Sequence, residues 1–133
     1  MFNSDLVLDY LTTGENNIKE IEFRKDLYAK LFLFLRTMQA VIDTSFVLIV
    51  NLNFKKPKNY LEVFSILREG NVISEATEEK MRMFAALRSK LIFDFQETEE
   101  DEARIIVSEF GEVFRNFSSE VKKFIKNLNL IYK

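Results

Sequence analysis

The sequence predicts an all-α fold: an antiparallel up-and-down bundle of four to five helices, in a single domain over residues 1–133. Three observations lead to this prediction. The chain contains only 3 Gly and 1 Pro, too few to punctuate a series of strands and tight turns. It is rich in Leu, Lys, Glu and Phe, which suit helices better than tight turns. Its apolar residues recur at spacings of three and four, the period of a helix with one buried face.

The N-terminal part predicts a short helix, a break and one long helix. The first helix is expected over residues 4–13, and the segment from Gly14 to Asn17 is expected to interrupt it before a helical turn over 18–23. The long helix is expected over residues 24–51, with a buried stripe of Leu27, Leu31, Phe34, Leu35, Met38, Ile42, Ser45 and Ile49. Further apolar residues lie off this stripe: Phe32, Leu33, Phe46, Val47 and Val50. Such a helix is either central to the bundle or buried against a second subunit, and both interpretations stay open.

Three more helices are expected after Pro57, because proline cannot continue a helix. A short helix over residues 60–69 is expected to end in a left-handed cap at Gly70. Ser74 is expected to cap a helix that runs to about residue 92. The acidic run 97–102 predicts the start of the last helix rather than a calcium-binding loop. That helix carries a seam of Ile106, Phe110, Val113, Phe117, Val121, Phe124 and Leu128.

The composition excludes several classes of function. The chain has no Cys and no His, so it lacks cysteine chemistry, the most common general acid/base and the most common metal ligand. No metal site and no cofactor are therefore expected. The net charge of −2 argues against a dedicated nucleic-acid binder, although Lys55, Lys56 and Lys58 could contact phosphate locally. The start lacks a basic region and no apolar run approaches a membrane span of roughly 20 residues, so a cytoplasmic protein without membrane contact is expected.

Residues 81–95 carry the most information about function. In a helix, the inward face is expected to hold Met81, Phe84, Leu87, Leu91 and Phe95. The opposite face is expected to hold Arg82, Ala86, Ser89 and Phe93. An outward phenylalanine preceded by two small residues favours the close approach of a second chain. Ala86, Ser89 and Phe93 are therefore predicted to form a homodimer interface.

At this segment the chain resembles the HepT-like family of the HEPN superfamily, the toxin partners of minimal nucleotidyltransferases. The stretch Arg88-Ser89-Lys90-Leu91-Ile92-Phe93-Asp94-Phe95 is similar to the family motif, in which an arginine is followed by a histidine and, two positions later, a tyrosine. Residues 39–43, 56–64 and 73–83 resemble the blocks that precede the motif in family members. The resemblance covers roughly residues 5–130 and includes the order of the blocks.

The resemblance implies a bundle like that of HEPN and nucleotidyltransferase-substrate-binding proteins, paired as a homodimer, with the motif residues of both subunits lining a cleft where RNA is cleaved. The motif arginine corresponds to Arg88, and Asp94 stands between the last two motif positions as in many members. The asparagine, histidine and tyrosine positions hold Ser89, Phe93 and Phe95.

These departures from the motif argue against an enzyme. Phe93 has no proton to exchange in place of histidine, so the catalytic set is not intact. In some members the partner attaches nucleotide to the motif tyrosine, but Phe95 lacks the hydroxyl group for this reaction. Nothing in the sequence singles out Tyr28, Tyr60 or Tyr132 as a substitute.

The sequence therefore predicts a degenerate HepT-like protein of a toxin–antitoxin type pair, a homodimer that binds a minimal nucleotidyltransferase and has lost its ribonuclease activity. One alternative is an RNA endonuclease toxin that uses Arg88, Lys90 and Asp94, since a buried lysine can titrate closer to neutral pH. Another is a non-catalytic RNA- or nucleotide-binding regulator, in which Arg82, Arg88 and Lys90 contact phosphate.

Overall fold

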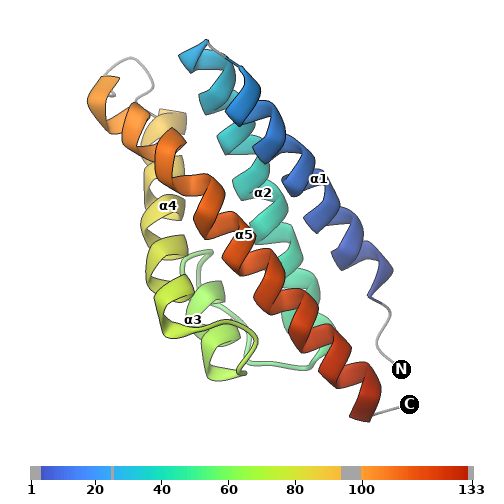
Figure 1. Ribbon diagram of the computed structural model, residues 1–133. Coiled ribbons are helices and arrows are strands. Elements are labelled where there is room, and N and C mark those ends of the chain that lie inside the picture. Colours follow the sequence, from blue (N-terminus) through green and yellow to red (C-terminus); the bar gives the residue numbers. More distant parts are fainter. Residues whose placement is uncertain (1–3, 25, 94–99, 132–133) are drawn as a thin grey trace.

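The fold is a bundle of helices, as predicted. The structure is a computed structural model that describes residues 4–24, 26–93 and 100–131. These residues form five helices, α1 (Asp5–Phe23), α2 (Leu27–Asn51), α3 (Glu62–Glu69), α4 (Glu75–Phe93) and α5 (Glu100–Ile131), and they contain no strand. Figure 1 shows α1 and α2 as an antiparallel hairpin, with α4 and α5 beside it and the short α3 at one end.

The packing of the four long helices defines two distinct faces. Helix α2 contacts α1, α4 and α5, and α5 contacts α1, α2 and α4, whereas α1 and α4 make no contact in the described parts of the chain. Helices α1 and α4 therefore lie at opposite corners of the bundle. The α1/α5 face and the α2/α4 face consequently point in different directions. In Figure 1, the beginning of α1 and the end of α5 lie at the same end of the molecule.

The predicted break at Gly14 is wrong, because α1 is continuous from Asp5 to Phe23. Gly14 is buried in the middle of this helix, and the ring of Phe114 from α5 lies against it. A Cβ atom at position 14 would come within 2.6 Å of Phe114 Cε2. Glycine is therefore present here to let α5 approach α1 closely, and the loss of helix propensity is offset by this packing.

Helix α2 begins at Leu27, three residues later than predicted, because Asp26 caps it. The Asp26 carboxylate accepts a hydrogen bond from the Tyr28 backbone N–H at 3.0 Å, and Arg24 has extended backbone angles. The predicted stripe is confirmed, with Leu31, Phe34, Met38, Ile42, Ser45 and Ile49 buried and Leu27 and Leu35 half-buried. On another side of α2, Phe32, Phe46 and Val50 remain exposed.

Helix α3 begins at Glu62 rather than at residue 60. The left-handed residue at its end is Asn71, one position after the predicted Gly70. The Asn59 side-chain oxygen accepts hydrogen bonds from the N–H groups of Leu61 (3.1 Å) and Glu62 (3.0 Å), so Tyr60 stays in a turn. Gly70 has φ −82°, and the left-handed residue is Asn71, with φ 61°.

Gly70 is required for space rather than for an unusual backbone angle. A Cβ atom there would lie 2.6 Å from Cζ of Phe54. The Phe54 ring therefore packs over the end of α3, and this contact anchors the segment that connects α2 to α3.

The predicted N-cap of α4 is confirmed. Ser74 Oγ accepts a hydrogen bond from the Thr77 N–H at 3.2 Å, and Glu120 of α5 accepts one from the Ser74 N–H at 2.5 Å. A carboxylate at the positive end of a helix is favourable, so this contact also ties α5 to the start of α4.

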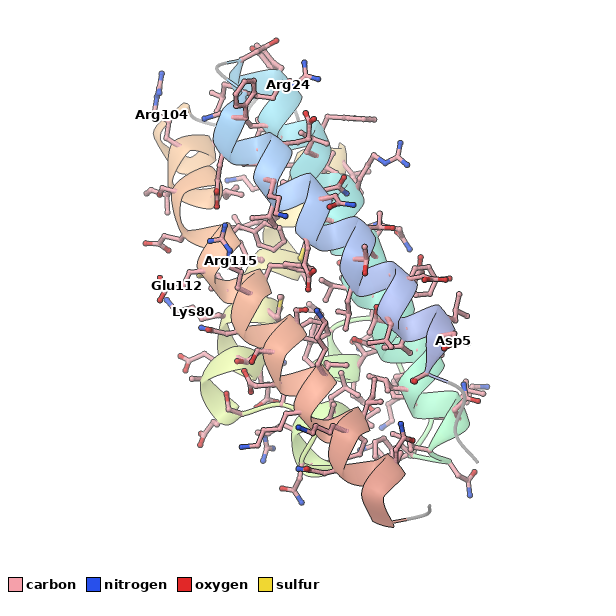
Figure 2. All side chains as sticks on the ribbon, turned by 45° about the vertical axis from the view of Figure 1, so that its right-hand side comes forward. Asp5, Arg24, Lys80, Arg104, Glu112 and Arg115 are labelled. Carbon is pink, nitrogen blue, oxygen red and sulfur yellow. The ribbon has the colours of Figure 1, made fainter. Side chains whose placement is uncertain are left out.

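Phenylalanine rings form the centre of the core. Phe34, Phe84 and Phe110 are fully buried and meet edge to face, with centroid separations of 4.7–6.0 Å. The predicted seam of α5 is confirmed in that Ile106, Phe110, Phe117 and Val121 are buried and Val113, Phe124 and Leu128 half-buried; Phe114 and Ile125 are also buried. Charged side chains such as those of Asp5, Arg24 and Arg115 project from the outside of the bundle (Figure 2).

Candidate functional site

Arg88 lies on the α2/α4 face and is held by a side chain of α2. Its Nη2 atom donates a hydrogen bond to Gln39 Oε1 at 2.5 Å, and Gln39 Nε2 donates to Asp43 Oδ1 at 2.9 Å. Gln39 and Asp43 are one helical turn apart, so the carboxylate orients the amide and the amide orients the guanidinium. Arg88 is half-buried, and its Nε atom has no hydrogen-bond partner among the described residues. This Nε atom is buried, so the free donor faces the interior and the contact with Gln39 is what orients the guanidinium.

The next residue, Ser89, contacts a tyrosine from the turn before α3. The hydroxyl groups of Ser89 and Tyr60 are hydrogen-bonded to each other, and both residues are half-buried. Ser89 was predicted to lie on the outward face in a dimer interface; it bonds to Tyr60 of the same chain, and its place in an interface stays a prediction. The helix turns by about 100° per residue, so Arg88 and Ser89 bond to different elements, α2 and the turn before α3.

The other predicted contact residues of α4 do not join Arg88 in one cluster. Arg82 is exposed, and its Nη1 atom donates a hydrogen bond to Ser65 Oγ of α3 at 3.2 Å. Lys90 and Ala86 are exposed, and each is two residues from Arg88, which places them on other sides of the helix. The basic residues of α4 are therefore spread along it rather than gathered around one point.

The end of the motif is described only in part. Phe93 is the last residue of α4, and its side chain lies outside the described residues. Asp94 and Phe95 also lie outside them. The predicted outward position of Phe93 and the predicted role of Asp94 therefore remain predictions. Within residues 4–24, 26–93 and 100–131, no group of three or more metal-binding side chains is present.

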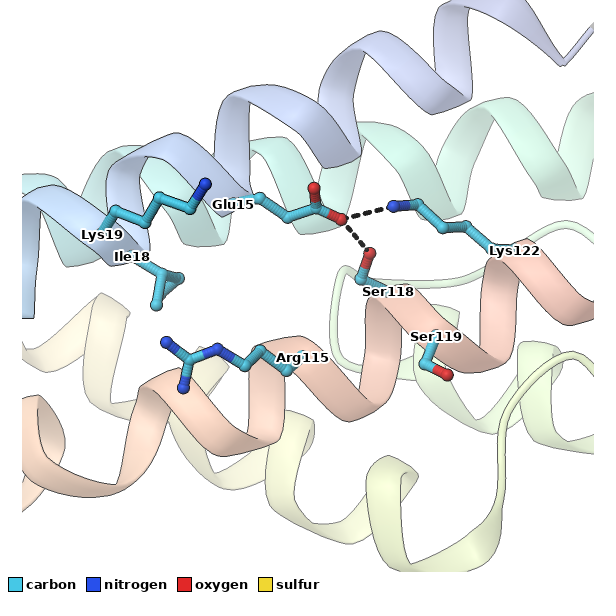
Figure 3. Close-up of a pocket in the computed structure, with 7 residues that line it drawn as sticks. All are labelled: Glu15, Ile18, Lys19, Arg115, Ser118, Ser119 and Lys122. Atoms are coloured by element: carbon cyan, nitrogen blue, oxygen red, sulfur yellow. Dashed lines mark hydrogen bonds and ion pairs between the residues drawn. The ribbon is translucent and has the colours of Figure 1, made fainter.

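The α1/α5 face contains a hollow of about 410 Å³, in which Glu15 of α1 bonds to Ser118 and Lys122 of α5 (Figure 3). Glu15 Oε1 accepts hydrogen bonds from Lys122 Nζ at 2.6 Å and from Ser118 Oγ at 2.9 Å, and Arg115 pairs with Glu22. The bond from Lys122 lowers the pKa of Glu15 below its usual range. Carboxylates of α1 thus neutralise cations of α5, and these bonds hold the two helices together.

The exposed apolar residues of α2 surround the polar contact between Gln39 and Arg88. Phe32 is 57% exposed, Phe46 39% and Val50 74%. Together with Gln39 and Asp43 they recur every three, four or seven residues, so they share one face of the helix. A hollow of about 370 Å³ continues this face at the end of α2, lined by Phe46, Ile49, Val50, Asn53, Phe54, Lys56 and Pro57.

By length and composition, α2 could cross a membrane, and it is the one helix in the described ranges that could. The apolar residues of α2 are interrupted by polar ones, so no single uninterrupted run reaches this length. However, 56% of its most apolar window is buried inside the bundle. The central helix of a bundle has the same length and composition.

Sequence reasoning did not identify Gln39, Asp43 and Tyr60 as site residues. Gln39 and Asp43 stand four residues apart, away from the buried stripe of α2, and this spacing was the available signal. No local signal could have paired Tyr60 with Ser89, because 29 residues separate them along the chain.

Fold and site together define a class: helical bundles that carry an arginine on an exposed face between their second and fourth helices. The family model for ribonuclease HepT-like proteins matches residues 6–121, and the chain belongs to this family. No curated protein matches the chain in sequence.

Solved structures confirm the HEPN bundle. The HEPN toxin of Shewanella oneidensis, described as tri-AMPylated and in complex with an MNT antitoxin, has a TM-score of 0.81 at 21% identity, with 92% of this chain and 99% of that chain covered. A toxin–antitoxin structure with AMP-PNP gives 0.80 at 21% identity, covering 90% and 98%. The cytosolic protein of unknown function YutE from Bacillus subtilis gives 0.80 at 15% identity, covering 91% and 89%.

Proposed function

We propose that this protein is a cytoplasmic homodimer that binds a minimal nucleotidyltransferase and has no ribonuclease activity of its own. The observation that carries the proposal is the position of Arg88: Gln39 orients its guanidinium on the α2/α4 face. The chain that presents this arginine contains no histidine. The scaffold and the motif arginine are those of a HepT-like protein. The proton-transfer residue that such a ribonuclease uses is replaced by Phe93.

The chemistry explains why Arg88 alone is insufficient. Cleavage of RNA without a metal requires a group that removes the proton of the 2′-hydroxyl and a group that protonates the leaving oxygen. A guanidinium stabilises phosphate charge but cannot be deprotonated in a protein. General acid–base catalysis contributes about 10²–10⁴-fold to a rate, so its loss removes most of the activity while leaving binding of phosphate or of a partner intact.

The apolar face of α2 supports the homodimer. Gln39 is the central residue of Leu27–Asn51, and exposed apolar side chains flank it on both sides, Phe32 toward one end and Phe46 and Val50 toward the other. In an antiparallel pair of α2 helices, the two-fold axis would pass near Gln39. Each Phe32 would then approach the Phe46 and Val50 region of the partner, and the two Arg88 residues would come near the axis. A two-fold interface requires this kind of self-complementary patch.

The nuclease part of the proposal is tested by restoring the missing group. The parent protein, its Phe93→His variant and the double variant Phe93→His, Arg88→Ala are incubated with a mixed-sequence RNA. We expect no cleavage by the parent, cleavage by Phe93→His, and loss of that activity in the double variant. Cleavage by the parent that disappears in its Arg88→Ala variant would refute the proposal, and would favour the enzyme that uses Arg88, Lys90 and Asp94.

The same samples separate the remaining alternative. A non-catalytic RNA-binding regulator would retain RNA on a filter at low salt and release it as the salt concentration rises, with a slope set by the number of phosphate contacts. We expect retention to be weak, because Arg82 and Lys90 do not lie beside Arg88.

A further inference from the structure

The hollow at the end of α2 combines an apolar lining with a rim of lysines. It has a volume of about 370 Å³, and its lining is apolar except for Asn53 and Lys56. Lys55, Lys56 and Lys58 are all exposed, and Glu62 is the single acidic residue from position 46 to position 62. The hollow therefore suits an occupant that brings an apolar side chain together with several negative charges.

One segment of this chain has that composition. Residues 94–102 include six acidic residues, no basic residue and a single apolar side chain, that of Phe95. The segment follows the end of α4 at Phe93 and includes the start of α5 at Glu100. We infer that, in the homodimer, segment 94–102 of one subunit docks on the lysine-rimmed hollow of the other, with Phe95 in the hollow and the carboxylates beside the lysines. The inference rests on the homodimer of the proposed function and deepens it.

The segment cannot reach the hollow of its own chain. Arg88 is bonded to Gln39, and from there α4 runs toward the start of α2 and ends at Phe93, about 7.5 Å further at 1.5 Å per residue (Figure 1). Val50, in the middle of the hollow, lies 11 residues beyond Gln39 in the opposite direction, which is about 16 Å. Residues 94–99 are fixed at both ends, so they extend at most about 12 Å outward at ~3.4 Å per residue. They cannot cover about 24 Å along the bundle, so the occupant has to be a second copy.

The two-fold arrangement brings the segment of the second copy to the hollow. With the axis near Gln39, the start of its α2 lies against the end of this α2, and its segment 94–102 begins on the side of the hollow. Its α4 ends about 7.5 Å from the axis and Val50 lies about 16 Å from it, which leaves about 9 Å to be covered along α2. Residues 94–99 extend that far. Symmetry makes the same contact twice in each dimer.

The first experiment reverses charges and measures the dissociation constant of the dimer by sedimentation. Lys56→Glu with Lys58→Glu changes the rim of the hollow, and Glu97→Lys with Glu99→Lys changes the segment. Each pair should raise the dissociation constant by about ten-fold or more at low salt, because like charges then face each other twice per dimer. The two pairs combined should restore tight pairing, and added salt should reduce the effect of each pair. Phe95→Ser should weaken the dimer at every salt concentration, because salt does not screen an apolar contact.

A matched control and a crosslink make the result specific. Lys123→Glu with Lys126→Glu changes two exposed lysines of α5, so it alters the net charge equally and should leave the dissociation constant unchanged. The chain contains no cysteine, so proteins that carry Lys56→Cys or Glu97→Cys form disulfides only between the introduced groups. After subunit exchange and mild oxidation of the mixed variants, we expect peptide mapping to find a disulfide between positions 56 and 97. It should find none when Lys126→Cys replaces Lys56→Cys.

The outcomes separate the inference from the proposed function. A parent protein that sediments as a monomer would refute the homodimer, and the inference with it. A dimeric parent whose dissociation constant is unchanged by Lys56→Glu with Lys58→Glu, or whose variants form no disulfide between positions 56 and 97, would overturn the inference alone. If reversal of the rim leaves the dimer intact but releases a co-purifying protein, the hollow belongs to that protein and the inference is equally wrong.

Discussion

Two glycines in the middle of helices provide a matched test of the packing between α1 and α5. Gly14 lies in α1 and Gly111 in α5, and replacing either by Ala removes the same unfavourable backbone entropy from a helix. That change alone stabilises a helix by about 1 kcal/mol. The two sites differ in the space that the new methyl group meets. The pair therefore isolates the effect of packing from the effect of helix propensity.

At Gly14 the methyl group has no room. It would lie 2.6 Å from Phe114 Cε2 and closer still to Cζ, and Phe114 is fully buried. The ring cannot withdraw freely, because it packs against Phe110 with a centroid separation of 6.3 Å. Overpacking of this kind costs about 1–3 kcal/mol. At Gly111 the nearest side-chain atom, Cγ2 of Ile18, would lie at 3.4 Å, which is an ordinary contact.

We expect Gly111→Ala to raise the free energy of unfolding by up to about 1 kcal/mol. Gly14→Ala should lower it, so that the two variants differ by about 1–3 kcal/mol. Urea denaturation followed by circular dichroism measures both, with equal m-values as the sign that only stability has changed. Equal stabilisation by both substitutions would refute the close approach of α5 to α1 at Gly14.

Two further predictions concern the two faces of the bundle. Val50→Asp places a charge in the apolar face of α2, so it should convert the homodimer into a folded monomer, as measured by chromatography with light scattering. The control Ile105→Asp, at a site on α5 that is 54% exposed, should leave the dimer intact. A Val50→Asp protein that is still a dimer would contradict the interface. Glu15→Gln should cost about 0.5–1 kcal/mol at neutral pH, a surface-pair value because the carboxylate is 35% exposed. The pKa of Glu15 is lowered on folding, so its contribution is present above the usual pKa of a glutamate and is lost as the pH falls through the folded-state value. The stabilities of the parent and Glu15→Gln should therefore converge in acid, and a difference that persists there would show that the carboxylate charge is not the cause.

The helical elements could be predicted wherever the relevant contacts are local. The buried stripe of α2 follows from the spacing of its apolar residues, and the cap of α4 follows from Ser74 and the acidic residues after it. The errors occurred where a distant residue decides the local structure. Gly14 would end a helix in isolation, but Phe114, 100 positions further along the chain, gives it a reason to stay inside one.

The site was predicted only at the position of its arginine. Arg88 is marked by the motif, whereas the residues that orient it and its neighbour come from other elements. Gln39 lies 49 residues before Arg88, and Tyr60 lies 29 residues before Ser89. Such pairs depend on how the helices are arranged, which the pattern of a single helix does not contain.

The polar contact between Gln39 and Arg88 has a consequence for the proposed dimer. A hydrogen bond at a surface contributes only about 1 kcal/mol to the stability of a fold, so it matters little to the monomer. Between two α2 helices the same group would be surrounded by Phe32, Phe46 and Val50, where a polar group without a partner is costly. A shift of one helix against the other by a single turn would place Gln39 and the Arg88 charge beside it opposite an apolar residue of the partner. Buried polar residues specify the register of coiled coils in this way. The polar centre would therefore hold the two Arg88 residues on either side of the axis, whether or not the protein still cleaves RNA.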